Sequence, residues 1–183
     1  ITVQSIKLSA EMVTVTDLSY NGTEQTPTVT VKNGETVLKK DKDYTLSGAL
    51  SATNAGSYKL TITGDGNNCV GIVEKTWKLA PMKLNGIRKV ENLSKTYNGT
   101  PYVELSKNAL TFYDENYNPT KIPDDVYEIT DARFMRLRED DKTYVNSPEV
   151  GGDKTIVFTV TLKSDNYVLI ECEYNNGIKT ETE

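Results

Sequence analysis

Apolar and polar residues alternate along most of the chain, and a period of two is typical of strands that bury one face. The clearest apolar faces are Val29 and Val31; Tyr58, Leu60 and Ile62; Val73, Trp77 and Leu79; and Ile156, Phe158, Val160 and Leu162. No stretch has sustained helical periodicity. We therefore predict an all-β chain and place Trp77 in a buried core.

Many short strand patterns follow one another with turn residues between them. In the first part of the chain, strands are predicted over residues 5–8, 12–16, 27–31, 36–38, 44–46, 58–63 and 72–79. In the second part, they are predicted over residues 82–84, 87–90, 102–105, 110–113, 126–129, 133–137, 155–162 and 167–174. About seven short strands at spacings of roughly 8–12 residues indicate a β-sandwich.

One tetrapeptide, Tyr-Asn-Gly-Thr, occurs at residues 20–23 and again at residues 97–100. A repeat of this kind predicts two modules, which we place at residues 1–81 and 82–183. Pro81 marks the boundary, and no Gly/Ser linker follows it. Because proline restricts the hinge, we expect a stiff molecule with the two sandwiches end to end.

Asn-Gly pairs are the strongest turn signals in the chain, since both residues tolerate positive φ. We expect turns at Asn33-Gly34 and Asn85-Gly86, and in both tetrapeptides. Gly22 and Gly99 are expected at positive φ, where a Cβ is penalised. These tetrapeptides are interpreted as structural turns and not as ligand sites.

Charge and composition exclude several classes of function. The formal net charge is −5, and the chain contains no histidine. An acidic balance disfavours nucleic-acid binding, which needs a cationic face. Without histidine the chain lacks the commonest general base and transition-metal ligand, so we predict neither an enzyme nor a metal or other cofactor. No apolar run is long enough to span a membrane.

The two cysteines fall one in each predicted module. Neither module can therefore close a disulfide of its own. Cys172 shares strand parity with apolar neighbours and is expected to point inward. Cys69 is expected in a turn and partly exposed.

Oxygen-rich turns and tyrosines are the remaining candidates for binding. Asp65-Gly66-Asn67, Asp124-Asp125 and Asp140-Asp141 could offer oxygens to Ca²⁺, but none has the regular acidic spacing of a calcium loop, and solvated turns are the favoured interpretation. Tyr113, Tyr117 and Tyr127 lie near amides and carboxylates, a combination that can hold a sugar or a peptide. The alternative is that they are ordinary strand and turn residues.

Several segments together resemble a known group of repeats. They are Tyr20-Asn21-Gly22-Thr23, Pro27, Asp43-Tyr44, Asn54-Ala55-Gly56-Ser57-Tyr58, Gly64-Asp65-Gly66-Asn67, Lys95-Thr96-Tyr97-Asn98-Gly99-Thr100 and Asp165-Asn166-Tyr167. The first module resembles the MBG-type, mucin-binding-like modules of bacterial exported adhesins, and the second is similar to YDG-type modules. The resemblance implies two tandem immunoglobulin-like β-sandwiches with an extracellular, cell-surface or secreted setting, and it brings no catalytic residues.

Two functions from different classes follow from these observations. The leading hypothesis is a non-enzymatic spacer or adhesion segment that forms a stalk with neighbouring repeat modules of the same chain. The alternative is a module that binds a host or surface glycan or protein through tyrosines near residues 112–127. An accessory domain of an enzyme is a third possibility. Exposure of Tyr113, Tyr117 and Tyr127 as one patch would favour the binding function.

Overall fold

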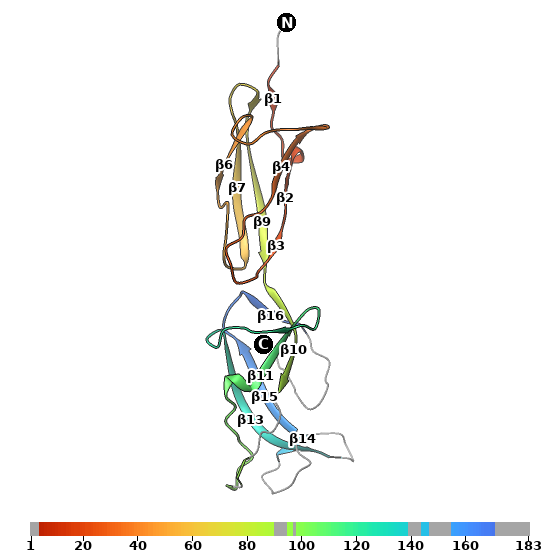
Figure 1. The fold of residues 1–183 in the computed structure, drawn as a ribbon, viewed down its shortest axis with the longest axis vertical. Helices are drawn as coiled ribbons and strands as arrows, with labels where there is room; N and C mark the ends of the chain where they lie inside the picture. Colours follow the sequence, from red (N-terminus) through yellow and green to blue (C-terminus); the bar gives the residue numbers. More distant parts are fainter. Residues whose placement is uncertain (1–3, 90–94, 97, 139–143, 147–154, 171–183) are drawn as a thin grey trace. The chain divides into compact units, whose positions relative to one another are not determined.

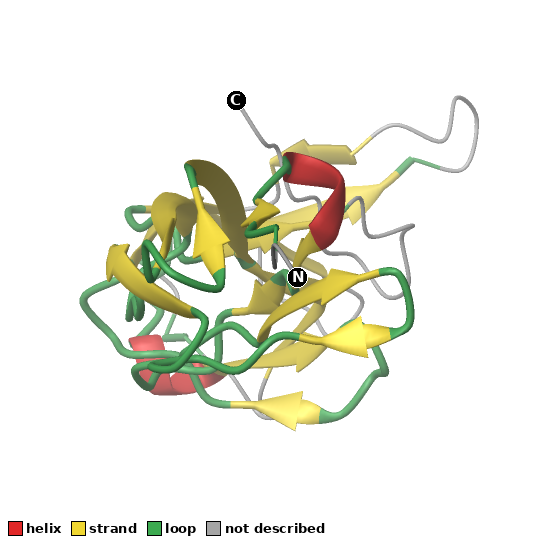
Figure 2. Cartoon of the chain, turned by 90° about the horizontal axis from the view of Figure 1, so that it is seen from above, coloured by secondary structure: helices red, strands yellow, loops and turns green. Residues whose placement is uncertain are grey.

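The computed structural model describes residues 4–89, 95–96, 98–138, 144–146 and 155–170. The chain divides into two units, Ile1–Met82 and Lys83–Glu183. Apart from two 3₁₀ helices, η1 (Ala10–Met12) and η2 (Lys107–Ala109), every regular element in these residues is a β-strand. Figure 2 shows the same predominance of strands and loops. The prediction of an all-β chain is confirmed.

The first unit contains two main sheets (Figure 1). One has the order β2 (Val13–Val15), β4 (Val29–Asn33), β5 (Thr36–Val37). The other has the order β3 (Leu18–Ser19), β9 (Ile72–Ala80), β7 (Gly56–Gly64), β6 (Tyr44–Gly48). A third, small sheet pairs β1 (Ile6–Lys7) with β8 (Cys69–Val70) in parallel.

The core of the first unit draws on both main sheets. Val31 of β4, Leu60 of β7 and Trp77 of β9 belong to one buried cluster. Trp77 is 0% exposed, and its indole Nε1–H donates to the carbonyl oxygen of Ala49 at 2.9 Å. Its ring lies 5.0 Å from that of Tyr58. The alternation read from the sequence thus identified the buried face of both long strands, and Trp77 is confirmed as a core residue.

The second unit also contains two sheets in its described residues. One has the order β12 (Pro119–Thr120), β11 (Leu110–Asp114), β10 (Met82–Lys89), β16 (Tyr167–Leu169). The other has the order β14 (Tyr144–Asn146), β13 (Tyr127–Leu137), β15 (Thr155–Leu162). Ile156, Phe158 and Val160 of β15 are buried, as their alternation predicts.

The two Asn-Gly pairs outside the tetrapeptides adopt different local structures. Asn33 ends β4 and pairs with Thr36 of β5, and Gly34, at φ +58°, begins the two-residue turn between these strands. The turn predicted at Asn85-Gly86 is wrong, because both residues lie inside β10. The pairing of β10 with β11 is irregular there, between Leu84 and Gly86. Asn-Gly also suits a β-bulge, and the partner strand decides which of the two structures forms.

Two predicted strands in the second unit are one strand in the structure. Residues 126–129 and 133–137 fall almost entirely within β13, whose pairing with β15 shifts between Thr130 and Arg133. Asp131 lies in this irregular stretch with φ +53°. A bulge explains why the alternation is interrupted there without a turn.

The predicted exposure of Cys69 is wrong. Cys69 opens strand β8 and is 0% exposed. The carboxylate of Asp65 accepts the backbone N–H of Cys69 at 2.7 Å, which closes the turn before this residue and leaves its side chain on the core. Burial raises the pKa of the Cys69 thiol, and nearby Asp43 adds to the effect. The predictions for Cys172 and for Asp140-Asp141 lie outside the described residues.

Candidate functional site

The last three residues of each tetrapeptide, residues 21–23 and 98–100, form the same turn. The side-chain oxygen of Asn21 accepts from the N–H and the hydroxyl of Thr23 at 3.0 and 2.8 Å. Asn98 accepts the same two bonds from Thr100, both at 3.2 Å. Gly22 has φ +84° and Gly99 has φ +77°, so the predicted positive φ is confirmed at both positions. The Asn and Thr side chains of the tetrapeptides thus hold their own backbone.

An isolated β-bridge follows each turn at the same distance along the chain. Gln25 and Tyr102 each stand two residues after their tetrapeptide. Gln25 pairs with Ala52, and Tyr102 pairs with Arg133 of β13. In the second unit, the N–H of Val103 donates to Ala132 at 2.9 Å, which holds this segment beside the bulge of β13.

The two bridge residues present very different side chains. Gln25 turns back on the first unit, where its amide Nε2–H donates to the carbonyl oxygen of Ser19 at 2.7 Å. Tyr102 is 54% exposed. The second unit holds its turn through a lysine instead, because Lys95 Nζ donates to the carbonyl oxygens of Thr100 and Tyr102 at 2.7 and 2.6 Å and to the Thr100 hydroxyl at 3.1 Å.

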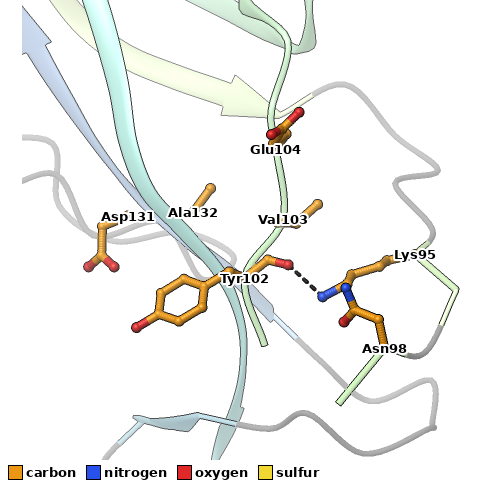
Figure 3. Close-up of a pocket in the computed structure, with 7 residues that line it drawn as sticks. All are labelled: Lys95, Asn98, Tyr102, Val103, Glu104, Asp131 and Ala132. Carbon is orange, nitrogen blue, oxygen red and sulfur yellow. Dashed lines mark hydrogen bonds between the residues drawn. The ribbon is translucent and has the colours of Figure 1, made fainter. Parts of the chain in front are cut away.

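A pocket of about 530 Å³ lies at Tyr102 (Figure 3). Its lining residues are Lys95, Asn98, Tyr102, Val103, Glu104, Asp131 and Ala132. In Figure 3 the Tyr102 ring and the Asp131 carboxylate lie on one side, and Lys95 and Asn98 lie on the other. The pocket therefore combines an aromatic ring, two small apolar side chains, an amide and carboxylates.

The structure does not bring the three predicted tyrosines together on one surface. Tyr127 is 2% exposed and packs edge-on against Phe112, with ring centroids 4.9 Å apart. Tyr113 is half-buried and follows Phe112 in β11, so it points to the opposite face of that strand. Tyr117 is 69% exposed in the turn between β11 and β12. The exposed patch that would have favoured binding through these residues is not formed.

A second pocket, of about 320 Å³, lies beside Tyr127, and its lining includes Lys107, Phe112 and Asp124. Its polar groups bind one another. Lys107 Nζ donates to the carbonyl oxygens of Asp124 and Tyr127, and the Tyr127 hydroxyl donates to the Lys107 carbonyl oxygen at 2.9 Å. Burial, and then Asp124, raise the pKa of Tyr127. We interpret this cluster as structural.

The acidic turns also serve the backbone. Asp65 accepts N–H bonds from Cys69 and Asn68, and the bond from Cys69 is the main reason why the pKa of Asp65 is lowered. Asp114 plays the same part in the turn before β12, where the N–H of Asn118 lowers the pKa of Asp114. Within the described ranges, no three Cys, Asp or Glu side chains are grouped so that they could hold a metal ion.

The sequence did not single out Tyr102 or Asp131. Tyr102 falls in a predicted strand, and Asp131 falls between two predicted strands. The signal that could have identified Tyr102 is its place in the repeat, since it is an aromatic residue where the first unit has Gln25. No local pattern indicated the bulge that brings Asp131 to the same pocket.

Comparison with known families bears on the first unit. Residues 8–82 match the model described as the MBG domain. The MBG part of the resemblance is thereby confirmed, and the YDG-type resemblance of the second unit stays a prediction. MBG domains are non-catalytic modules that occur in surface proteins.

The other comparisons add no relative: no curated protein and no solved structure matches the chain. In the part of the chain that the structure describes, no helix is both long enough and apolar enough to cross a membrane.

Proposed function

We propose that the chain is a pair of immunoglobulin-like β-sandwich modules that act as spacer and adhesion segments of a bacterial cell-surface or secreted protein. The observation that carries this proposal is the MBG match over residues 8–82, because MBG domains occur in surface proteins. The sharing of one core by the three- and four-stranded sheets of the first unit supports the sandwich part.

The proposed role is non-enzymatic. The absence of histidine from the sequence removes the most common general base, and the carboxylates of Asp65 and Asp114 are engaged with backbone N–H groups. These features suit a module whose polar residues maintain its shape.

The location can be tested on the organism that produces the protein. Antibodies raised against the two-unit chain should label intact cells, or recover the protein from the culture medium. Labelling that appears only after the cells are permeabilised would overturn the proposed function. An antibody against a cytosolic protein of the same cells is the control for leakage.

The spacer role makes a separate prediction about stiffness. Only Pro81 separates β9 from β10, and a fixed φ at this position restricts a hinge. We expect small-angle scattering of the two-unit chain to report an elongated particle with little bending. Insertion of a Gly/Ser linker after Pro81 should broaden the distribution of distances, and no change on insertion would contradict a stiff connection.

The adhesion role needs a binding surface, and the pocket at Tyr102 is the observation that favours one. It replaces the tyrosines near residues 112–127 as the candidate for the glycan- or peptide-binding alternative, because Tyr127 is buried and Tyr102 is exposed.

A further inference from the structure

We infer that the Tyr102 pocket binds a neutral oligosaccharide, a ligand that is rich in hydroxyl groups and carries no charge. This inference deepens the adhesion part of the proposed function. It rests on three features of the pocket: an exposed ring, a set of polar groups that are open to a ligand, and a lysine ammonium group, Lys95, that already donates to oxygens of the protein.

The exposed ring supplies the apolar plane. Tyr102 is 54% exposed, and Val103 and Ala132 line the same pocket with small apolar side chains. The face of a pyranose ring that carries C–H groups packs on such a plane, because it loses little hydration and gains dispersion contacts. The backbone of Tyr102 and Val103 is fixed by its pairing with β13, so the ring is presented from a defined position.

Polar groups elsewhere in the pocket lining match the hydroxyls of a sugar. In the described structure, the Asn98 side-chain N–H groups, the Tyr102 hydroxyl and the Glu104 carboxylate make no hydrogen bond within the protein. They offer donors and acceptors together. A sugar hydroxyl donates and accepts, so it can use both kinds at once.

The cations of the pocket argue against an anionic ligand. All three N–H bonds of the Lys95 ammonium group point at oxygens of Thr100 and Tyr102. Next to the pocket, Arg133 Nη1 donates to Asp131 at 3.0 Å. A sialate, sulfate or phosphate would have to displace these bonds, and it would also meet the negative charge of Glu104. A neutral ligand requires neither change.

The first unit provides an internal comparison. At the equivalent position, Gln25 donates its amide N–H to Ser19 and presents no ring. The turn and the bridge form in both units, so an aromatic side chain is not needed for either of them. Tyr102→Gln therefore removes the proposed binding surface and introduces a residue that this bridge already accommodates in the first unit.

The experiment is an NMR titration of the ¹⁵N-labelled two-unit chain. The probes are neutral oligosaccharides of hexoses and N-acetylhexosamines, the same oligosaccharides with sialic acid or sulfate added, and a lysine-rich peptide. We expect at least one neutral probe to shift the amide signals of residues 98–104 and 131–133. Its sialylated and sulfated forms should bind more weakly.

Variants identify the residue responsible. Tyr102→Gln should weaken binding at least about tenfold, and Tyr102→Phe, which keeps the ring, should change it by less than about threefold. Tyr117→Gln is the matched control, since Tyr117 is also exposed and lies in the same unit; it should bind like the wild type. The amide spectrum of each variant reports whether it folds.

Several outcomes would overturn the inference. They are binding of none of the probes, preference for the charged glycans or for the lysine-rich peptide, and equal binding by wild type and Tyr102→Gln. None of these binding results tests whether the protein is located outside the cell. If the antibodies label intact cells and no probe binds, the chain is a spacer and only the inference fails. If the protein is not found outside the cell, the proposed function fails whatever the titration gives.

Discussion

The two units share a turn and a bridge but complete them with different chemistry. In the first unit the residues before the tetrapeptide form β3, which pairs in parallel with β9. In the second, the ammonium group of Lys95 ties the turn to Thr100 and Tyr102.

The difference extends to the surface. Gln25 satisfies its own amide against the backbone, whereas Tyr102 projects its ring beside a bulge that carries Asp131. Comparison of the two units therefore distinguishes the features that both units share from those found in the second unit. The turn and the bridge belong to the fold, and the ring, the bulge and the lysine belong to the second unit alone.

The test with the largest expected effect removes a buried aromatic side chain from one unit at a time. Trp77→Ala should cost the first unit about 3–5 kcal/mol, because it leaves a cavity and the Ala49 carbonyl loses its donor. Phe158→Ala should cost the second unit a similar amount, since Phe158 is as deeply buried. Calorimetry of the two-unit chain should show one transition shifted by each variant. If both transitions move together, the units do not unfold independently.

The shared turn can be tested with matched glycine variants. Gly22→Ala and Gly99→Ala should each cost their own unit about 1–2 kcal/mol, because both glycines have positive φ. Neither new Cβ would meet an atom within 4 Å, so no clash adds to this cost. Gly48→Ala is the contrasting variant, since its Cβ would also lie 2.9 Å from the Lys59 carbonyl oxygen; chemical denaturation should show a greater loss.

The lysine tie should matter only in the second unit. Lys95→Met keeps the aliphatic stem and removes three hydrogen bonds, and we expect it to destabilise the second unit by about 1 kcal/mol. Lys59→Met is the control, because the Lys59–Glu74 ion pair is exposed and worth little. Equal denaturation midpoints for Lys95→Met and the wild type would show that the turn does not need the tie.

The smallest expected effect is on how the stability of each unit changes at acid pH. The pKa of Asp65 is lowered in the folded first unit, and that of Asp114 in the second. Each carboxylate therefore adds stability above its unfolded pKa of about 3.9, and this stability is lost as the pH falls through the lower folded value. Asp65→Asn should flatten the acid dependence of the first unit's melting temperature, and Asp114→Asn that of the second.

The fluorescence of Trp77, the one tryptophan of the sequence, follows the first unit in this experiment. Far-UV circular dichroism reports both units. An unchanged acid profile for both variants would contradict the assignment of these carboxylates to the turns.

The sequence was a good guide wherever a local rule determines the structure. Alternation identified the buried faces of β7, β9 and β15, because side chains in a strand change face at every residue. Positive φ at Gly22 and Gly99 followed from the turn residues alone. These features do not depend on which strand lies next to them.

The structure at Asn85-Gly86 and the exposure of Tyr102 and Tyr127 could not be predicted, because they depend on pairing between residues far apart in the sequence. Asn85-Gly86 has the same two residues as the hairpin turn at Asn33-Gly34, and only its partner β11 makes it a bulge. Tyr127 and Tyr102 are both strand or bridge tyrosines, yet one is buried and the other is exposed. The exposure of each tyrosine depends on which of its faces meets the core, and this is decided by pairing with residues far away in the sequence.

Because Cys69 is buried, the rate at which its thiol is alkylated can report how often the first unit opens locally. The side chain is fully covered, and its pKa is raised, so an alkylating reagent can reach a reactive thiolate only when the small sheet of β1 and β8 comes apart. The labelling rate of the Cys69 peptide, followed by mass spectrometry, therefore measures how often the sheet of β1 and β8 opens. Under a stretching force, the same rate would report whether β1 and β8 separate before the main sheets yield.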